Sequence, residues 1–210
     1  ANLYKNVGLY EEAISCFLLS QRAEEAENLF ELMDEHELES PKVYCLKGDI
    51  YKDIKYYEKA LLISHNKYPR AFRSLGRYYY NIKDNEKSLI NYLKAVEIND
   101  YNKESWQMIG YIYYINKDYQ LSINAYQKVL SIDSDTLIAW SNMATCYSLL
   151  NQSRKAFDSL VCALKLSSNN WQLWQNMLVF ALENDEITYF INSCLKLIEL
   201  GHEEVLTEPI

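Results

Sequence analysis

The sequence predicts an all-α protein built as a right-handed α-solenoid of antiparallel helix hairpins. The main observation is a 34-residue repeat within 103–170, in which Trp106 recurs as Trp140 and Tyr113 recurs as Tyr147. A period of this length is typical of helical hairpins that stack on one another. The composition supports the prediction, because 49% of the residues are apolar while only 5 are Gly and 3 are Pro.

Within each repeat, the order of large and small residues indicates two helices that cross closely. Counted from Lys103, large residues are expected at positions 4, 7, 11 and 24 and small residues at positions 8, 20 and 27. Small residues let the two helices approach, whereas the large residues fill the space between hairpins. Repeats are therefore predicted at 69–102, 103–136 and 137–170, with a divergent copy at 171–204.

The preceding segment, 41–68, fits a repeat with a shortened second helix. Ala60 and Gly76 are closer together in the sequence than Ser88 and Gly110, which are the equivalent residues of two regular repeats. The second helix is therefore expected to be about one and a half turns short. Pro69 would end the segment, because proline lacks an N–H and restricts the residue before it.

The two ends of the chain are less regular. Residues 1–40 are predicted to hold a partial helical repeat region, with one helix from Leu9 through Phe17 and another from Ala23 to His36. Residues 205–210 are expected to form a tail, and the repeats to form one continuous solenoid domain. Because the chain begins at Ala1 within a helical pattern, it is expected to be a fragment of a longer protein.

Charge is distributed unevenly along the chain. The net charge is −8, and residues 1–40 carry ten acidic residues against Lys5 and Arg22. Residues 41–77 carry nine Lys and Arg against Asp49, Asp53 and Glu58. A sequence pI of about 5.0 argues against direct nucleic-acid binding, which needs many cations on one surface.

The remaining composition indicates a non-catalytic protein without a cofactor. Five cysteines include no CxxC pair, which favours a reducing compartment and predicts no metal site; a cytoplasmic or nuclear location is expected. The longest apolar run, Met177–Leu182, is too short to span a membrane. With no glycine-rich phosphate loop and no catalytic constellation, we expect neither an enzyme nor a small-molecule substrate.

These positions resemble the tetratricopeptide repeat. Ser134 and Ser168 depart from the repeat, which often has Pro at that position. Beside the shortened helix, five segments carry a narrower resemblance: Tyr57-Glu58-Lys59-Ala60-Leu61, Arg70-Ala71-x-Arg73-Ser74-Leu75-Gly76, Lys155-Ala156-Phe157, Ala163-Leu164-Lys165 and Trp171-Gln172-x-Trp174. These segments are similar to one family of such proteins, the tetratricopeptide repeat protein 27 family. This resemblance implies an intracellular scaffold or co-chaperone-like protein with links to the assembly of large ribonucleoprotein particles.

In arrays of this kind, positions 2, 5, 9 and 12 of each first helix face the concave side, which suggests where a partner binds. Spacings of three and four positions place three arginines on one helical face, where guanidinium groups could bind carboxylates. The alternatives are a solvated face or pairing with the chain's own residues 1–40, and for the tyrosines a merely Tyr-rich composition. The candidate partner-binding residues are Arg70, Arg73, Arg77, Tyr80, Gln107, Tyr111 and Tyr114.

The sequence therefore predicts a protein–protein interaction scaffold whose concave groove binds an acidic or extended segment of a partner. The alternative is an architectural spacer whose faces pack against other parts of the same protein. Trp106, Trp140 and Trp174, all at position 4, are expected to be packing residues between hairpins.

Overall fold

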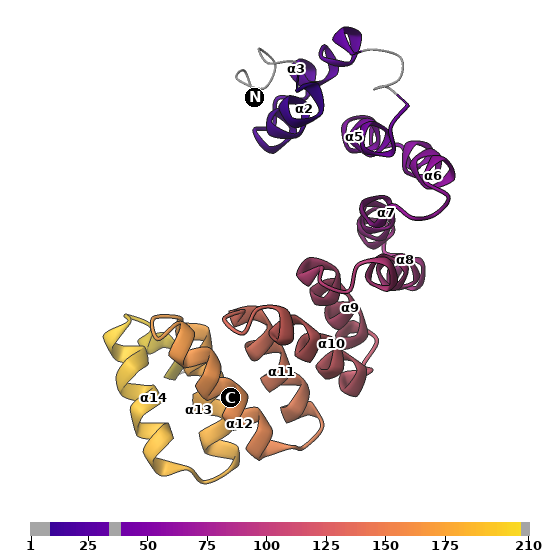
Figure 1. Cartoon of the computed structure of the whole chain (residues 1–210). Coiled ribbons are helices and arrows are strands. Elements are labelled where there is room, and N and C mark those ends of the chain that lie inside the picture. Colours follow the sequence, from indigo (N-terminus) through magenta and orange to yellow (C-terminus); the bar gives the residue numbers. More distant parts are fainter. Residues whose placement is uncertain (1–8, 34–38, 207–210) are drawn as a thin grey trace. The chain divides into compact units, whose positions relative to one another are not determined.

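The computed structural model describes residues 9–33 and 39–206, and every element in those ranges is helical (Figure 1). Consecutive helices pack against each other as hairpins, including α7 on α8, α11 on α12 and α13 on α14. The prediction of an all-α fold of consecutive helix hairpins is confirmed. The expectations for residues 1–8, 34–38 and 207–210 lie outside the described residues.

The chain divides into two compact units, an N-terminal unit of residues 1–105 and a C-terminal unit of residues 106–210. Helix α9 begins in the first and continues into the second. The helices are α2 (Tyr10–Leu19), α3 (Ala23–Glu27), η1 (Phe30–Leu32), α5 (Pro41–Tyr51), α6 (Ile54–Ile63), α7 (Pro69–Asn81), α8 (Asn85–Ile98), α9 (Lys103–Ile115), α10 (Tyr119–Ile132), α11 (Leu137–Leu149), α12 (Ser153–Leu166), α13 (Trp171–Glu183), α14 (Ile187–Glu199) and η2 (Glu203–Leu206).

The regular hairpins share one register and one kind of turn. Their first helices begin at Pro69, Lys103, Leu137 and Trp171, and the second helix follows at the same interval each time. The turn between them contains one residue in the left-handed region, which reverses the chain and lets later N–H groups bond the last carbonyls. Accordingly, the N–H of Asp84 donates to the carbonyl oxygen of Tyr79 over 2.9 Å. The left-handed residues are Lys83, Lys117, Asn151 and Asp185, with φ between 55° and 66°.

The close crossing predicted at positions 8 and 20 is present in two hairpins. Ser88 Oγ donates to the carbonyl oxygen of Gly76 over 2.8 Å, and Ser122 Oγ donates to that of Gly110 over the same distance. Both serines are fully buried. A hydrogen bond from a serine side chain to the backbone of the other helix therefore fixes the point where the two helices cross. Glycine at that point lets the backbones approach.

The shortened hairpin differs from the prediction in where its residues are missing. Helix α6 has 10 residues and α8 has 14, so α6 is about one turn short and not one and a half. The interval from the start of α5 to the start of α6 is shorter than the matching interval of a regular hairpin. The interval from the start of α6 to the start of α7 is shorter by the same amount. Half of the shortening therefore precedes α6. After α6, His65 and Asn66 both have positive φ, which turns the chain into Pro69.

The N-terminal region also corrects the prediction. Instead of one helix from Ala23 to His36, α3 ends at Glu27, a single 3-10 turn follows, and Met33 is extended. The apolar residues of this segment are nevertheless buried together. Ala26, Leu29, Phe30 and Met33 lie in one cluster with residues of α2 and with Val43 and Leu46 of α5.

The C-terminal end is not a simple tail. Val205 lies in η2 and is buried against Leu178 and Leu197, so the described part of 205–210 belongs to the core around α13 and α14.

The tryptophans at position 4 pack as expected, each half-buried. Trp140 Nε1 also donates to the carbonyl oxygen of Ser134 over 2.9 Å, which ties the first helix to the preceding loop.

Candidate partner-binding surface

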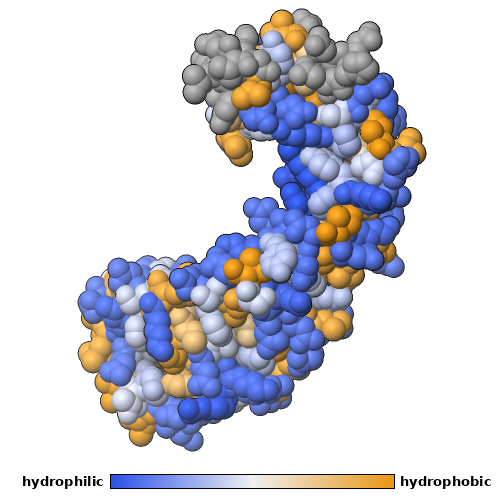
Figure 2. Space-filling model, viewed as in Figure 1, coloured by the Kyte–Doolittle hydropathy of each residue, from blue (hydrophilic) through white to orange (hydrophobic). Residues whose placement is uncertain are grey.

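The arginine row, defined as Arg70, Arg73 and Arg77 on α7, lies beside α5. Arg70 Nη2 is 3.2 Å from Asp49 Oδ2, and Arg77 Nη2 is 2.8 Å from Asp49 Oδ1. Two of the three guanidinium groups therefore share one carboxylate of the neighbouring hairpin. Pairing with residues 1–40 was one alternative from the sequence; among the described residues, the ion-pair partner of Arg70 and Arg77 is Asp49. Figure 2 shows strongly hydrophilic residues along the edge formed by α5 and α7.

Asp49 also accepts a hydrogen bond from a residue of α6. The hydroxyl of Tyr57, on α6, donates to Asp49 Oδ1 over 2.9 Å, and the Asp49 side chain is only 15% exposed. Burial, and then the negative charge of Asp49, raises the pKa of Tyr57, which keeps this phenol a hydrogen-bond donor. Asp49 thus joins α5, α6 and α7 through one carboxylate.

Arg73 is the cation of the row that makes no ion pair or hydrogen bond within the part of the chain that the structure describes. It is half-buried and lies near two other helices. Burial raises the pKa of Cys45 on α5 to about 12, and that of Tyr92 on α8 to about 12; Arg73 opposes both shifts. The negative charge of Glu104 raises the pKa of Tyr92, so Glu104 also lies near Tyr92.

The acidic N-terminal region pairs with a different cation. Lys42 Nζ lies 2.8 Å from Glu11 Oε2 and 2.6 Å from Glu12 Oε1, and Ser40 Oγ donates to Glu11 over 2.8 Å. These contacts hold α2 to the start of α5. Among the described residues, these acidic side chains therefore pair with Lys42, whereas the alternative from the sequence was that residues 1–40 pair with the arginine row.

The four other candidate residues fall in both units. Tyr80 follows the arginine row on α7 and is half-buried. In the C-terminal unit, Gln107 is half-buried and Tyr111 is 39% exposed. Tyr114 packs beside the buried cluster of α10 and α11, with its ring centroid 6.1 Å from that of Tyr119. Tyr111 is therefore the more accessible of the two candidate tyrosines on α9.

Sequence reasoning missed two features of the site. It gave Asp49 no role, although three side chains bind this carboxylate, because the residues that bind it lie on two other helices. It also missed a pocket in the C-terminal unit between α11, α12 and α13. A signal for that pocket was available, since the repeat has Tyr at residues 92 and 126 but Leu at residue 160.

In residues 9–33 and 39–206, no three His, Cys, Asp or Glu side chains are grouped so that they could hold a metal ion. Of the helices in those ranges, none combines the length and the apolar character that crossing a membrane requires.

The sequence model of the tetratricopeptide repeat family matches residues 41–63, 70–102 and 103–136. The chain contains tetratricopeptide repeats. Repeats of this family generally mediate protein–protein interactions and are typically non-catalytic. The matched segments include α5, α6 and nearly all of α7, and thus the arginine row and its carboxylate.

One relative of this chain is a tetratricopeptide repeat protein 27 homolog from Dictyostelium discoideum. The two are 30% identical over 105 residues, which are 50% of this chain and 12% of the relative. The chain therefore corresponds to a small part of that protein's length, and the similarity is distant.

Solved structures resemble the fold over most of the chain. Pseudomonas aeruginosa PilF has a TM-score of 0.76 at 14% identity, covering 95% of this chain and 96% of PilF. MamA has a TM-score of 0.67 at 16% identity, covering 82% of this chain and 97% of MamA. YrrB, described as a TPR protein with an unusual peptide-binding site, has a TM-score of 0.66 at 13% identity, covering 95% and 89%. At these identities the likeness shows the fold alone.

Proposed function

We propose that this protein is a non-catalytic interaction scaffold that binds an acidic, extended segment of a partner protein through the arginine row. The observation that carries the proposal is the charge balance on α7. Three guanidinium groups lie on one helical face, and Asp49 is the one carboxylate that ion-pairs with them among the described residues. The face therefore has positive charge available for a partner's carboxylates.

Arg73 is the proposed primary contact. Its planar guanidinium can bind a carboxylate with two parallel hydrogen bonds, which a lysine cannot reproduce. Arg70 and Arg77 are already oriented by Asp49, so less side-chain entropy is lost when a partner binds beside them. The acidic segment would thus meet a preorganised surface.

Charge alone would hold such a segment weakly, because an exposed ion pair contributes only about 0.2–1 kcal/mol. Aromatic side chains supply larger contact area at interfaces. We therefore include Tyr80 of the N-terminal unit in the proposed site. Gln107, Tyr111 and Tyr114 of the C-terminal unit are proposed as further contacts.

The proposal extends to an intracellular role in the assembly of large protein complexes, in the cytoplasm or nucleus. It is supported by the distant similarity to the tetratricopeptide repeat protein 27 homolog and by the absence of disulfides, since all five cysteines are free. A co-chaperone-like activity would be one form of this role.

The proposal is tested with a short, fluorescently labelled peptide of alternating acidic and apolar residues. Arg73→Glu is expected to weaken its binding several-fold, whereas Lys55→Glu, the same charge change on the exposed face of α6, is expected to leave it unchanged. Binding of the wild-type protein should also weaken as salt is raised. Equal binding by Arg73→Glu and wild type, with circular dichroism showing both folded, would remove the arginine row from the function.

A further inference from the structure

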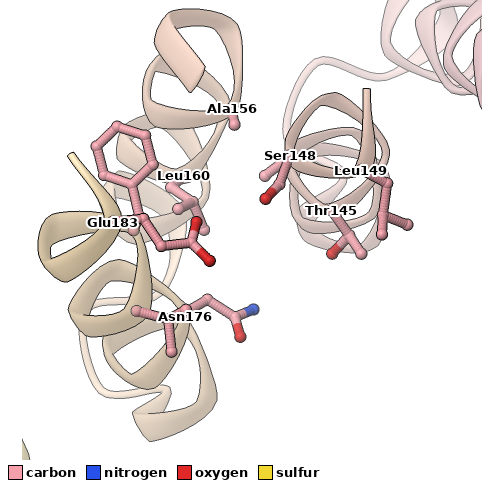
Figure 3. Close-up of a pocket in the computed structure, with 10 residues that line it drawn as sticks. Thr145, Ser148, Leu149, Ala156, Leu160, Asn176 and Glu183 are labelled. Atoms are coloured by element: carbon pink, nitrogen blue, oxygen red, sulfur yellow. The ribbon is translucent and has the colours of Figure 1, made fainter. Parts of the chain in front are cut away.

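The C-terminal unit contains a small pocket between α11, α12 and α13, with a volume of about 180 Å³. Figure 3 shows Thr145 and Ser148 on one side of the opening and Asn176 and Glu183 of α13 on the other. The pocket is lined by Ala144, Thr145, Ser148, Leu149, Ala156, Leu160, Asn176, Val179, Phe180 and Glu183.

The preceding hairpin explains why this space is empty. There, the ring of Tyr126 lies against Gly110, and Asn142 Nδ2 donates to the phenolic oxygen of Tyr126 over 2.8 Å. Tyr126 is 1% exposed, so its ring is buried at the equivalent place in that hairpin. A tyrosine from the second helix and an asparagine from the next first helix thus close this part of the surface.

The same positions recur in the following repeat with one decisive change. Asn142 is matched by Asn176, but Tyr126 is matched by Leu160, whose shorter side chain has no ring and no hydroxyl. Asn176 retains its place on α13, and its side chain makes no hydrogen bond within the described part of the chain. In Figure 3 its amide points into the space between α13 and α11. The pocket therefore corresponds to a missing phenol together with the amide that would bind it.

We propose that this pocket binds a tyrosine side chain carried by a segment of a partner protein. The ring would pack against Leu160, Val179 and Phe180, and its hydroxyl would pair with the amide of Asn176. Size supports this occupant, because an apolar cavity of about 150 Å³ holds a benzene ring. Pockets for larger organic ligands occupy about 300–1,000 Å³. Glu183, the charged residue among those that line the pocket, can accept a hydrogen bond from the phenol.

This site is separate from the arginine row, because its residues lie in the other unit and its contacts need no charge on the ligand. The two can therefore fail independently. Arg73→Glu is expected to leave binding of a phenol unchanged, and loss of the tyrosine pocket is expected to leave binding of an acidic peptide without tyrosine unchanged.

The test uses p-cresol, which has the side-chain chemistry of tyrosine, and toluene, which lacks the hydroxyl. Binding to the full chain is followed by chemical shifts of backbone amides on α11 and α13. We expect p-cresol to shift those resonances and to bind several-fold more tightly than toluene. Asn176→Ala is expected to remove that difference. Equal binding of the two probes to the wild type, or no shift with either, would overturn the proposal.

The double variant Ala144→Gly/Leu160→Tyr supplies the sharpest test, because it restores both the tyrosine of the preceding hairpin and the glycine that its ring lies against. It is expected to fill the pocket, to pair with Asn176 and to abolish p-cresol binding. If this variant does not fold, Val179→Phe blocks the opening from α13 and is expected to have the same effect on binding. Undiminished p-cresol shifts on α11 and α13 in a folded blocking variant would place the probe elsewhere and overturn the proposal.

Discussion

The ring of Tyr92 lies so close to Gly76 that a Cβ added at Gly76 would be 2.8 Å from its Cδ2 and Cε2 atoms. Tyr92 is 5% exposed and cannot move aside freely. Real Cβ atoms do not approach a ring carbon this closely, so the glycine is required by the tyrosine that faces it. In the third regular hairpin the equivalent pair is Ala144 and Leu160, where a small added methyl and a shorter side chain occur together.

Gly76→Ala is expected to destabilise the protein by about 1–2 kcal/mol, since overpacking outweighs the better helix propensity of alanine. Tyr92→Leu alone should also destabilise, because it leaves a cavity. The double variant copies Ala144 and Leu160, so its loss should be about 1 kcal/mol or more below the sum of the single losses. Urea unfolding of the four proteins measures this coupling, and additive losses would contradict the packing argument.

Asp49→Asn is expected to lower the free energy of unfolding by about 1–3 kcal/mol, because Tyr57, Arg70 and Arg77 all lose a charged acceptor. The same change should strengthen binding of the acidic peptide, since removing the internal competitor for Arg70 and Arg77 outweighs the loss of the orientation that Asp49 gives them. Glu58→Gln, which removes one negative charge from the exposed face of α6, is the matched control. Weaker binding by Asp49→Asn would show that Asp49 serves the site by orienting the arginines.

Cys45 is expected to resist alkylation in the folded protein. It is fully buried, and burial raises the pKa of its thiol to about 12 even though Arg70 and Arg73 oppose the shift. Only the thiolate reacts with iodoacetamide. Because the pKa is about 12, the thiolate population of Cys45 near neutral pH is negligible. Mass spectrometry of alkylated peptides compares Cys45 with the less buried Cys16 and Cys162 in the same sample. Labelling of all three at one rate would rule out the packing of α5 described above.

The contact between Glu12 and Lys42 is expected to make stability depend on pH at the acid end. The hydrogen bond from Lys42 lowers the pKa of Glu12 from its ordinary 4.5, so the unfolded chain binds the proton more readily. The contribution is therefore fully present above pH 4.5 and is lost as pH falls through the lower folded pKa. Unfolding of wild type and Glu12→Gln should converge at low pH, with exposed Glu24→Gln as control.

The regular repeats could be predicted closely because their fold depends on side chains at fixed spacing. Every first helix from Pro69 onward begins where the register places a repeat, since the large and small positions are set within one hairpin. The shortened hairpin was harder, because the sequence interval between Ala60 and Gly76 cannot show which side of α6 lost residues. The break after Glu27 was not visible, since the apolar spacing continues through it.

The candidate site was predictable only where it follows from one helix. Spacing on α7 indicates that the arginines share a face, but the pairing of Arg70 and Arg77 with Asp49 depends on how α5 lies beside α7. The pocket depends on an absent ring, and it becomes visible only when Leu160 is compared with Tyr126 and the asparagine opposite each is considered. Contacts between hairpins, unlike contacts within one, are not encoded at a single position.

The turns inside the regular hairpins offer a means of engineering. Lys83, Lys117, Asn151 and Asp185 each adopt a left-handed conformation that costs an ordinary residue about 1–2 kcal/mol. Substitution by glycine removes that cost, but it lowers the free energy of unfolding by about 0.4–1 kcal/mol because the unfolded chain becomes more flexible. The turns carry neither the arginine row nor the pocket. Heat resistance could therefore be raised one turn at a time while the chemistry of both binding surfaces stays as it is.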